Sequence, residues 1–288
     1  MFSSRYFRII STALILQFAC AHSTPALEIV ILEPKAAEGN VEAMFELGRA
    51  YLHGQGAPHD ETKALLYFRQ AAEKGHAKAQ HNYGLMLLEG RGAEADPAQA
   101  AKWFRCSAEQ GTARSQETLG LMLLEGQGVG KDTKKALEWL QKAAAHGESE
   151  AQLRVGLAYY GGDNIDQDYT QAAHWLTLAA VQDKIAAMNA LGSLYEDGLG
   201  VTTDLEQAVR WYKKAADAED AKAQANIGRL YATGTGVERD PVKAYEWLAR
   251  SAAHGEALGA NLLADLKRGL TAGQITEGER RALEPVGK

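Results

Sequence analysis

Histidine, cysteine and carboxylate side chains are the groups of this chain that could hold a metal ion or transfer protons. Eight histidines occur, but none lies in a His-Glu-x-x-His arrangement or with cysteine at zinc-ligand spacing. His53 and His59 flank one predicted loop, and His76 and His81 are five residues apart. Each pair lacks a third ligand, and we predict no metal site.

Nucleotide and acyl-transfer motifs are also missing. Residues 126–130, Gly-Gln-Gly-Val-Gly, imitate a phosphate-binding loop, but no predicted strand precedes them and the dinucleotide fingerprint fails. The sequence contains no Gly-x-Ser-x-Gly or Ser-x-x-Lys motif. Acidic residues recur at fixed positions as helix caps and exposed groups, so no carboxylate pair suited to acid–base catalysis stands out. We therefore predict that the protein is not an enzyme and has no catalytic residue or cofactor.

The charge balance argues against nucleic acid as a partner. The chain has 31 Lys and Arg against 37 Asp and Glu, a formal net charge of −6, and no basic run. Its two cysteines, Cys20 and Cys106, are too few for a disulfide scaffold or a multi-cysteine zinc site. We expect a folded chain that does not bind nucleic acid.

The first 26 residues have the pattern of a secretory signal peptide. Arg5 and Arg8 precede the apolar stretch 9–19, which is too short to cross a bilayer core of about 30 Å. Small residues then permit cleavage after Ala21 or Ala26. We expect a periplasmic or secreted protein without a membrane span, and a buried N-terminal helix is the alternative.

Cys20 raises a second interpretation of this segment, an outer-membrane lipoprotein anchored at that cysteine. The residues before it, Gln-Phe-Ala, depart from the Leu-small-small-Cys signal at two of three places. A lipid anchor is therefore the minor alternative. If cleavage removes Cys20, Cys106 is left as a lone thiol, either free or bonded to another molecule.

A period of 36 residues governs the rest of the chain. It is marked by Gly39, Gly75, Gly111 and Gly147, and the same count then reaches Asp183, Glu219 and Gly255. Six units follow without insertion or deletion: 39–74, 75–110, 111–146, 147–182, 183–218 and 219–254. Positions are given below as offsets from the first residue of a unit, so that Gly39 has offset 0. A fixed period of this length indicates a solenoid of stacked repeats.

Two residue types make the repeat signature. Offset 9 holds Gly48, Gly84, Gly120, Gly156, Gly192 and Gly228. Offset 28 holds all five tryptophans, Trp103, Trp139, Trp175, Trp211 and Trp247, with Tyr67 in the first unit. We expect the small residues to let helix axes approach closely and the aromatic residue at offset 28 to fill the remaining volume.

Each unit contains two predicted helices. Apolar residues of the first recur at helical spacing, and the glycine at offset 15 ends it because glycine accepts the left-handed conformation of a helix C-terminus. The aspartate at offset 21 is placed to cap the second helix, and Pro97 and Pro241 follow two of these caps. One helix pair cannot bury its apolar face alone, so the units must stack.

The segments before and after the six repeats have the features of capping elements. Residues 27–38 resemble an incomplete second helix, in which Pro34 predicts a kink. Residues 255–268 repeat the first-helix pattern, and within 255–288 a polar helix is expected from a capping box at Thr271 and Gln274 to about Leu283. This last helix would cover the end of the core.

Three places depart from the repeat. Asp183 and Glu219 replace the glycine between units, and neither enters the left-handed conformation easily. We therefore expect differently built joints there, for example by helix extension, with a change of superhelical curvature. A local turn adjustment without consequence is the alternative. Residues 161–164, Gly-Gly-Asp-Asn, replace Gly-x-Gly and predict a different loop.

The face of the first helix opposite its packing stripe is apolar in the middle units. It carries Leu85, Leu88, Leu121, Leu124, Leu153, Leu157 and Tyr160, and it turns polar afterwards with Asn189, Ser193, Glu196 and Arg229. One interpretation is a groove that binds a partner. The other is that these side chains pack against neighbouring units and are mostly buried.

The repeat resembles the Sel-1-like repeat family, a relative of the tetratricopeptide repeats. Residues 79–111 and 221–255 carry the resemblance, with Ala-Gln near the start and Gly-x-Gly and Asp-Pro between the helices. The resemblance implies a right-handed superhelix of antiparallel helix pairs and an all-α fold. It also implies an adaptor that binds a protein or peptide in a bacterial envelope or on a host partner.

Two further functions stay open. Some exported members are described as β-lactamase-like or penicillin-binding, but they carry a cysteine pair in each repeat and this chain does not. A binder of peptidoglycan fragments is the other. Our expectation is an exported, non-enzymatic scaffold for protein–protein interaction, possessing no reactive centre.

Overall fold

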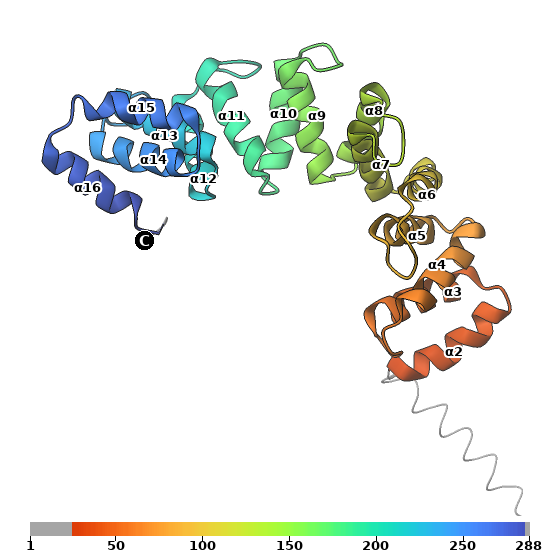
Figure 1. Cartoon of the computed structure of the whole chain (residues 1–288). Coiled ribbons are helices and arrows are strands. Elements are labelled where there is room, and N and C mark those ends of the chain that lie inside the picture. Colours follow the sequence, from red (N-terminus) through yellow and green to blue (C-terminus); the bar gives the residue numbers. More distant parts are fainter. Residues whose placement is uncertain (1–24, 286–288) are drawn as a thin grey trace, which may run out of the picture. The chain divides into compact units, whose positions relative to one another are not determined.

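The computed structural model describes residues 25–285, which form fifteen α-helices, α2 to α16, and no strand (Figure 1). Residues 1–24 lie outside the described part, so most of the predicted signal peptide and Cys20 do too. The described chain divides into two compact units, one ending at Asp132 and the other beginning at Thr133. We call them the N-unit and the C-unit.

The N-unit contains six helices. They are α2 (Pro25–Ala37), α3 (Val41–His53), α4 (Glu61–Glu73), α5 (Ala77–Glu89), α6 (Pro97–Glu109) and α7 (Ala113–Glu125). Each helix packs against the next along the chain. Pro34 lies inside α2, which continues to Ala37. The odd-numbered helices from α3 onward are the first helices of repeats.

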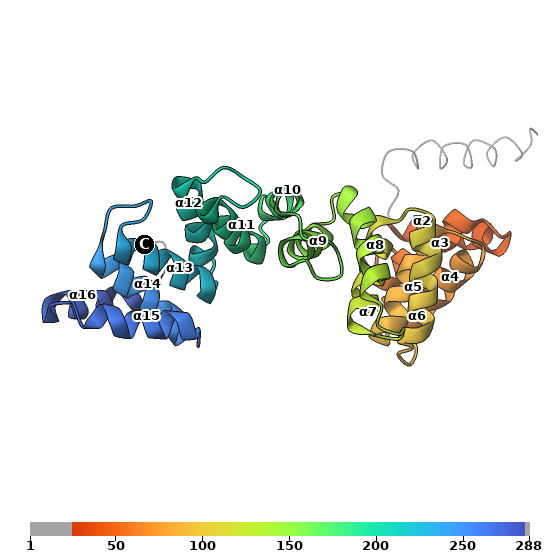
Figure 2. The same cartoon turned by 90° about the horizontal axis from the view of Figure 1, so that it is seen from above.

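The C-unit contains nine helices among its described residues. They are α8 (Thr133–Ala145), α9 (Ser149–Gly161), α10 (Tyr169–Ala180), α11 (Ile185–Asp197), α12 (Leu205–Asp217), α13 (Ala221–Thr233), α14 (Pro241–Ala253), α15 (Ala257–Lys267) and α16 (Ala272–Ala282). Consecutive helices from α8 to α15 again lie side by side, and α16 packs against α14 (Figures 1 and 2). The fold is an α-solenoid of antiparallel helix pairs, as predicted.

Local sequence signals set the helix ends. The predicted glycines at offset 15 adopt the left-handed conformation at the C-terminus of a first helix, for example Gly54 with φ 67°. The aspartates at offset 21 cap second helices, and Asp60 accepts a hydrogen bond from the Lys63 amide at 2.9 Å. Pro97 and Pro241 occupy the first helical turn. These predictions are confirmed.

The interior is built mainly from offset 29, and the prediction that offset 28 fills it holds only for Trp247, which is 7% exposed and belongs to the core of the C-unit. Residues at offset 29 are at most 2% exposed: Phe68, Phe104, Leu140, Leu176, Tyr212 and Leu248. Most of the tryptophans at offset 28 are only half-buried. A Cβ at Gly48 would lie 2.6 Å from the Phe68 ring, and one at Gly192 would lie 2.7 Å from the Tyr212 ring. Glycine at offset 9 therefore makes room for the large side chain at offset 29.

The tryptophans pack at the edge of each second helix. Trp103 meets Tyr83 edge to face, with ring centroids 5.5 Å apart. Lys142 lies 4.1 Å from the Trp139 ring centroid and Lys214 lies 4.4 Å from that of Trp211. These contacts bury one side of each indole beneath an alkyl-ammonium side chain.

The joints around the fifth repeat correct another expectation. Asp183 and Glu219 keep the left-handed conformation of the glycine that they replace, with φ 61° and 65°. The turn hydrogen bonds are kept as well, since the Glu219 amide donates to the Ala216 carbonyl and the Asp220 amide to the Ala215 carbonyl. The second helices are not extended through these positions. Packing on both sides imposes the turn on residues that disfavour it.

The loop of the fourth repeat is also regular. Asn164 takes the place of the second loop glycine and adopts a φ of 61°. Asparagine tolerates this conformation better than most side chains because its short amide can form local hydrogen bonds. The sequence change therefore leaves the backbone turn intact, and the prediction of a different loop is wrong.

Glu219→Gly is expected to stabilise the C-unit by about 0.5–1 kcal/mol. Glycine removes the left-handed strain of roughly 1–2 kcal/mol but gives the unfolded chain more entropy. Thermal unfolding should show a midpoint raised by about 2 °C. The matched control is Gly255→Ala at the next joint, where φ is 82° and no atom lies within 4 Å of an added Cβ. That control should lower the midpoint, and a Glu219→Gly midpoint that falls would contradict a strained joint.

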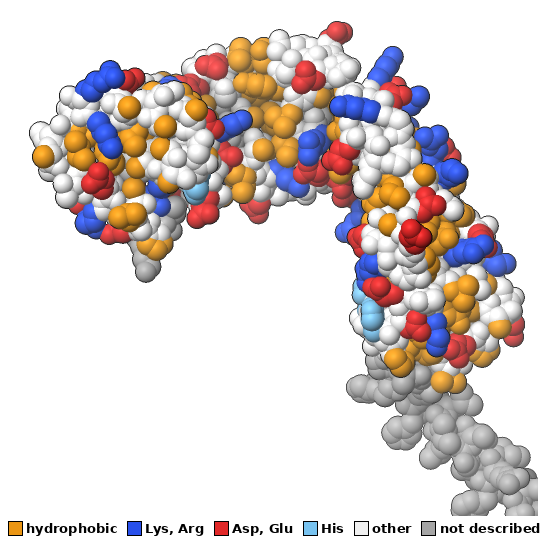
Figure 3. Space-filling model, viewed as in Figure 1, with side chains coloured by type: hydrophobic (Ala, Val, Ile, Leu, Met, Phe, Trp, Pro, Cys, Tyr) orange, Lys and Arg blue, Asp and Glu red, His pale blue; other side chains and the backbone are white. Residues whose placement is uncertain are grey.

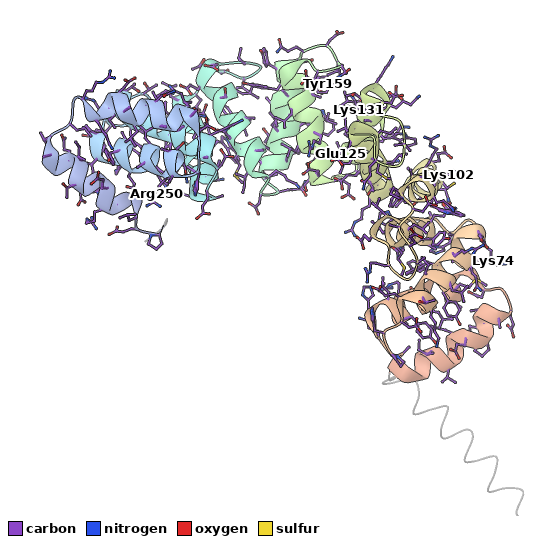
Figure 4. The ribbon with its side chains drawn as sticks, viewed as in Figure 1. Lys74, Lys102, Glu125, Lys131, Tyr159 and Arg250 are labelled. Atoms are coloured by element: carbon purple, nitrogen blue, oxygen red, sulfur yellow. The ribbon has the colours of Figure 1, made fainter. Side chains whose placement is uncertain are left out.

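The C-terminal helix is fastened by three kinds of contact. The predicted capping box is present, since Thr271 and Gln274 each bond to the other's backbone amide. A Cβ at Gly278 would lie 2.6 Å from the buried Tyr245 ring, so α16 approaches α14 closely. Arg250, labelled in Figure 4, pairs with Glu246 at 3.2 Å and donates to the Arg281 carbonyl at 2.7 Å.

Candidate functional site

A groove runs along the first helices of the C-unit. It has a volume of about 590 Å³. Its walls come from α9, α11, α13 and the start of α15, and it is lined by Leu157, Tyr160, Ala186, Asn189, Ala190, Ser193, Asp220, Ala221, Lys222, Asn226 and Glu256. Its lining combines apolar side chains with amide and hydroxyl groups. We call this the α9–α13 groove.

Hydrogen bonds between first helices position the polar groups of the lining. Asn226 Nδ2 donates to Asn189 Oδ1 at 3.1 Å, which joins α13 to α11. The Tyr160 hydroxyl lies 3.3 Å from Ser193 Oγ, which joins α9 to α11. Each of these side chains keeps further donor or acceptor positions. The arrangement can therefore bind the peptide groups of an extended chain.

Both signs of charge border the groove. Asp220 caps α13 by accepting from the Ala223 amide at 2.7 Å, and Glu256 caps α15 by accepting from the Leu258 amide at 3.3 Å. Lys222, two residues after Asp220, also lines the groove. The rim thus presents carboxylates held by helix N-termini beside a single lysine.

A partly buried ion pair fixes two of these helices. Arg229 on α13 lies 2.8 Å from both Glu196 carboxylate oxygens on α11. The Tyr212 hydroxyl of α12 donates to Glu196 at 3.1 Å. Burial, followed by the nearby Glu196 charge, raises the pKa of Tyr212. These contacts hold the spacing of α11 and α13 and so the width of the groove.

The predicted groove residues fall into three sets. Leu157 and Tyr160 are half-buried and line the α9–α13 groove. Leu153 is 8% exposed and belongs to the hydrophobic core of the C-unit, where it contributes packing. The leucines of α5 and α7 are half-buried in the N-unit: Leu85, Leu88, Leu121 and Leu124. Their role as a binding surface stays a prediction.

A glutamine at offset 5 is a feature that the sequence reasoning missed. Its buried amide donates to the carbonyl of the residue eight positions earlier, at 3.1–3.3 Å, in Gln80, Gln116, Gln152 and Gln224. Gln80 and Gln152 also accept from Gln110 and Gln182 at offset 35, at 2.7 and 2.8 Å. The recurrence of Gln at one offset was the available signal. This pair bridges consecutive second helices.

His81 ends a buried chain of hydrogen bonds in the N-unit. Ser107 donates to the Ala77 carbonyl, Ser115 donates to Ser107, and His81 Nδ1 lies against Ser115, each at 2.8 Å. Because the Ser115 hydroxyl proton points to Ser107, Nδ1 carries the proton of a neutral imidazole. Burial, followed by the nearby Arg114, lowers the pKa of His81 to about 4. Ser115 is fully buried and serves as structure.

The other residues that could do chemistry are dispersed. His76 caps α5 and lies 3.2 Å from Glu42. Within residues 25–285 no group of three or more His, Cys, Asp or Glu side chains is close enough to hold a metal ion. Cys106 is exposed and free. None of the described helices combines the length and hydropathy needed to cross a bilayer.

The described residues form repeated pairs of helices, and this arrangement defines a helical-repeat protein. A model of the Sel1 repeat matches residues 41–76, 77–112, 113–148, 149–183, 185–220 and 221–256. The chain belongs to the Sel1 repeat family. Members of this family are generally protein-interaction scaffolds with a non-catalytic fold.

Two solved structures of the same family are similar to the chain. The first is c5321, described as a protective antigen of uropathogenic Escherichia coli with an SLR fold, at 31% identity and a TM-score of 0.74. The match covers 87% of this chain, which spans only 55% of that protein. A Sel1 repeat protein from Oxalobacter formigenes is 33% identical with a TM-score of 0.60, covering 76% of this chain and 90% of that one. No curated protein matched the sequence.

Proposed function

We propose that this chain is an exported, non-enzymatic scaffold that binds an extended segment of a protein partner in the α9–α13 groove. The groove itself is the observation that carries the proposal. It combines half-buried apolar side chains with amides that face the same space on neighbouring first helices. A peptide in such a groove would place an apolar side chain near Leu157 and hydrogen-bond its backbone to Asn189 and Asn226.

Two features of the groove support an extended protein segment as the partner. The groove walls are rigid because Glu196, Arg229 and Tyr212 lock α11 to α13, and rigid walls reduce the ordering cost of binding. The rim carries Asp220, Glu256 and Lys222, which favours a segment with mixed charge. The N-terminal arginines and apolar stretch 9–19 support export to an envelope or extracellular compartment.

The half-buried leucines of α5 and α7 support a comparable strip in the N-unit. Leu121 and Leu124 lie on one helix face, one turn apart, and keep part of their surface exposed. They offer the apolar contacts that a partner would cover.

Ala190→Glu is expected to weaken capture of the partner at least tenfold, or about 1.4 kcal/mol. The new side chain fills the groove with charge beside Leu157, and the half-buried Ala190 has only a methyl group to lose from its contact with the core. Affinity purification from the cells that make the protein, followed by mass spectrometry and titration of the captured protein, measures the effect. Ala253→Glu on the exposed end of α14 is the matched control.

We expect Ala253→Glu to stay within about 0.5 kcal/mol of the parent protein, as most surface substitutions do, and the half-buried Ala190→Glu to cost about 1 kcal/mol with helicity retained. Equal capture by Ala190→Glu and Ala253→Glu would contradict binding in the groove. The double variant Leu121→Asp, Leu124→Asp examines the N-unit strip in the same purification. Loss of capture with helicity retained supports that strip, whereas loss of helicity shows that the two leucines are structural.

A further inference from the structure

A second pocket of the C-unit lies among second helices, away from the α9–α13 groove. It has a volume of about 700 Å³. Its walls are the C-terminal ends of α10 and α12 and the start of α11, and it is lined by Ala180, Val181, Asp183, Ile185, Met188, Trp211, Lys214, Asp217 and Ala218. We call it the Met188 pocket. None of its residues lines the α9–α13 groove.

The pocket exists because the glutamine bridge is missing here. Offset 5 is Met188 in this repeat, and offset 35 is Ala218. In the repeat before it, Gln152 and Gln182 occupy these offsets and close the space with a 2.8 Å hydrogen bond. Neither methionine nor alanine can form that bond, so the gap between α10 and α12 stays open.

Further departures from the repeat make the rim apolar. Val181 is 64% exposed at offset 34, where the first two repeats carry Glu73 and Glu109. Ile185 is 37% exposed at offset 2, where neighbouring repeats carry alanine or serine. Figure 3 shows hydrophobic side chains exposed over α10 and α11 among charged ones. Four substitutions thus converge on one place, and each makes it more open or more apolar.

The polar surroundings favour a positive charge. α10 and α12 both end at the pocket, and helix C-termini carry partial negative charge. Asp183 makes no ion pair within the described residues, and the Asp217 carboxylate forms an ion pair with Lys213 at 2.7 Å. The Ala180 carbonyl accepts only the turn amide of Asp183 there, whereas the same carbonyl in other repeats also accepts from glutamine. Lys214 is the one positive charge in the lining, and its ammonium group lies over the Trp211 ring.

The equivalent place in the N-unit shows what the apolar rim adds. Met44 and Lys74 replace the bridge there, and a pocket of about 620 Å³ opens beside them. Glu33, Glu73 and Lys74 border it, and Lys74 is labelled in Figure 4. Its rim is charged where that of the Met188 pocket is apolar. The missing bridge alone opens a space, and only the Met188 pocket combines it with an exposed aliphatic rim.

We propose that the Met188 pocket binds a protein segment that presents an aliphatic side chain beside lysine or arginine. The aliphatic side chain lies against Met188, Ala180 and the Trp211 edge, covered by Val181 and Ile185. The basic residue meets Asp183 and donates to the Ala180 carbonyl at the end of α10. This site is separate from the α9–α13 groove and gives the scaffold a second contact with a basic partner.

Methionine-methyl NMR tests the site on the whole chain. The sequence has five methionines, and the Met188 signal is identified by its loss in Met188→Gln. The probe is the peptide acetyl-Gly-Lys-Leu-Lys-Gly-amide, with Lys-Ser-Lys and Glu-Leu-Glu versions as controls. We expect the Lys-Leu-Lys peptide to shift the Met188 signal saturably, with a dissociation constant on the order of 1 mM. The Met44 signal should stay in place.

The second test uses a variant in which the Met188 pocket is closed. Met188→Gln with Ala218→Gln restores the bridge of the neighbouring repeat and should keep or raise thermal stability. Fluorescence polarisation of the labelled Lys-Leu-Lys peptide should then show binding lost at least tenfold. Asp183→Asn should weaken binding about two- to fivefold, in line with a single exposed charge contact. The control pair Gln80→Met, Gln110→Ala breaks the other bridge, where Glu73 and Ala77 stand in the places of Val181 and Ile185. It opens a space without the apolar rim and should add no binding.

Two results would overturn the proposal. One is a Met188 signal that does not move, or that moves equally with all three peptides. The other is a closed variant that binds the peptide as well as the parent chain does. Both readouts are independent of capture by the α9–α13 groove, so either site can fail alone.

Discussion

Phe104→Ala is expected to destabilise the N-unit by about 3–5 kcal/mol, the largest loss that we expect from any single side chain. Phe104 is fully buried, and its ring lies 3.0 Å from where a Cβ on Gly84 would be. Truncation leaves a cavity between α5 and α6 that the surrounding helices cannot fill without moving. Denaturant unfolding followed by circular dichroism measures the loss.

The neighbouring Trp103 is the matched control. Its side chain is half-buried and meets Tyr83 edge to face at 5.5 Å, so Trp103→Ala should cost about half as much. A double variant sharpens the test, because Gly84→Ala crowds the ring in the parent protein but partly refills the cavity in Phe104→Ala. A larger loss of stability in Trp103→Ala than in Phe104→Ala would contradict the role of offset 29, since offset 28 would then fill the interior.

Acid is expected to weaken the N-unit through His81. The pKa of His81 in the folded protein is about 4, below the usual value near 6.5, because burial disfavours the imidazolium. Between these two values the unfolded chain binds a proton that the folded chain does not. Stability is therefore fully present above about pH 6.5 and falls as the pH drops toward 4, by about 3 kcal/mol in total.

His81→Gln separates this effect from the titration of other groups. Glutamine keeps a hydrogen-bond donor near Ser115 but has no charge to bury. The free energy of unfolding should be measured at pH 7 and at pH 4.5 for both proteins. We expect the parent protein to lose about 2 kcal/mol more than His81→Gln over that interval. His53→Gln is the control at an exposed position at the end of α3, and it should lose as much stability as the parent protein does. Equal losses in all three proteins would show that burial of His81 is not the cause of the acid effect.

Signals confined to one turn of chain could be predicted from the sequence. Asp60 caps α4 and Gly54 ends α3 because those side chains and conformations act within three or four residues. The 36-residue period and the family resemblance then predicted the α-solenoid. The capping box of α16 was predicted for the same local reason.

Signals that depend on a neighbouring helix were harder to predict. Offsets 28 and 29 are adjacent and both apolar, and only contact with the glycine at offset 9 decides which of them points inward. Glu219 is unfavourable in a left-handed turn when judged alone, yet packing on both sides holds it there. The Met188 pocket required comparison of bridges between repeats, because one missing hydrogen-bond pair opens it.

Site-specific photo-crosslinking is the most direct measurement of whether this chain acts by binding a protein along its first helices. A benzophenone amino acid at position 190 lies in the α9–α13 groove, and the same group at position 206 lies on an exposed part of α12. In the cells that make the protein, we expect one protein adduct from position 190 that Asn189→Ala with Asn226→Ala abolishes. The same adducts from both positions, or none from position 190, would contradict the groove as the binding site.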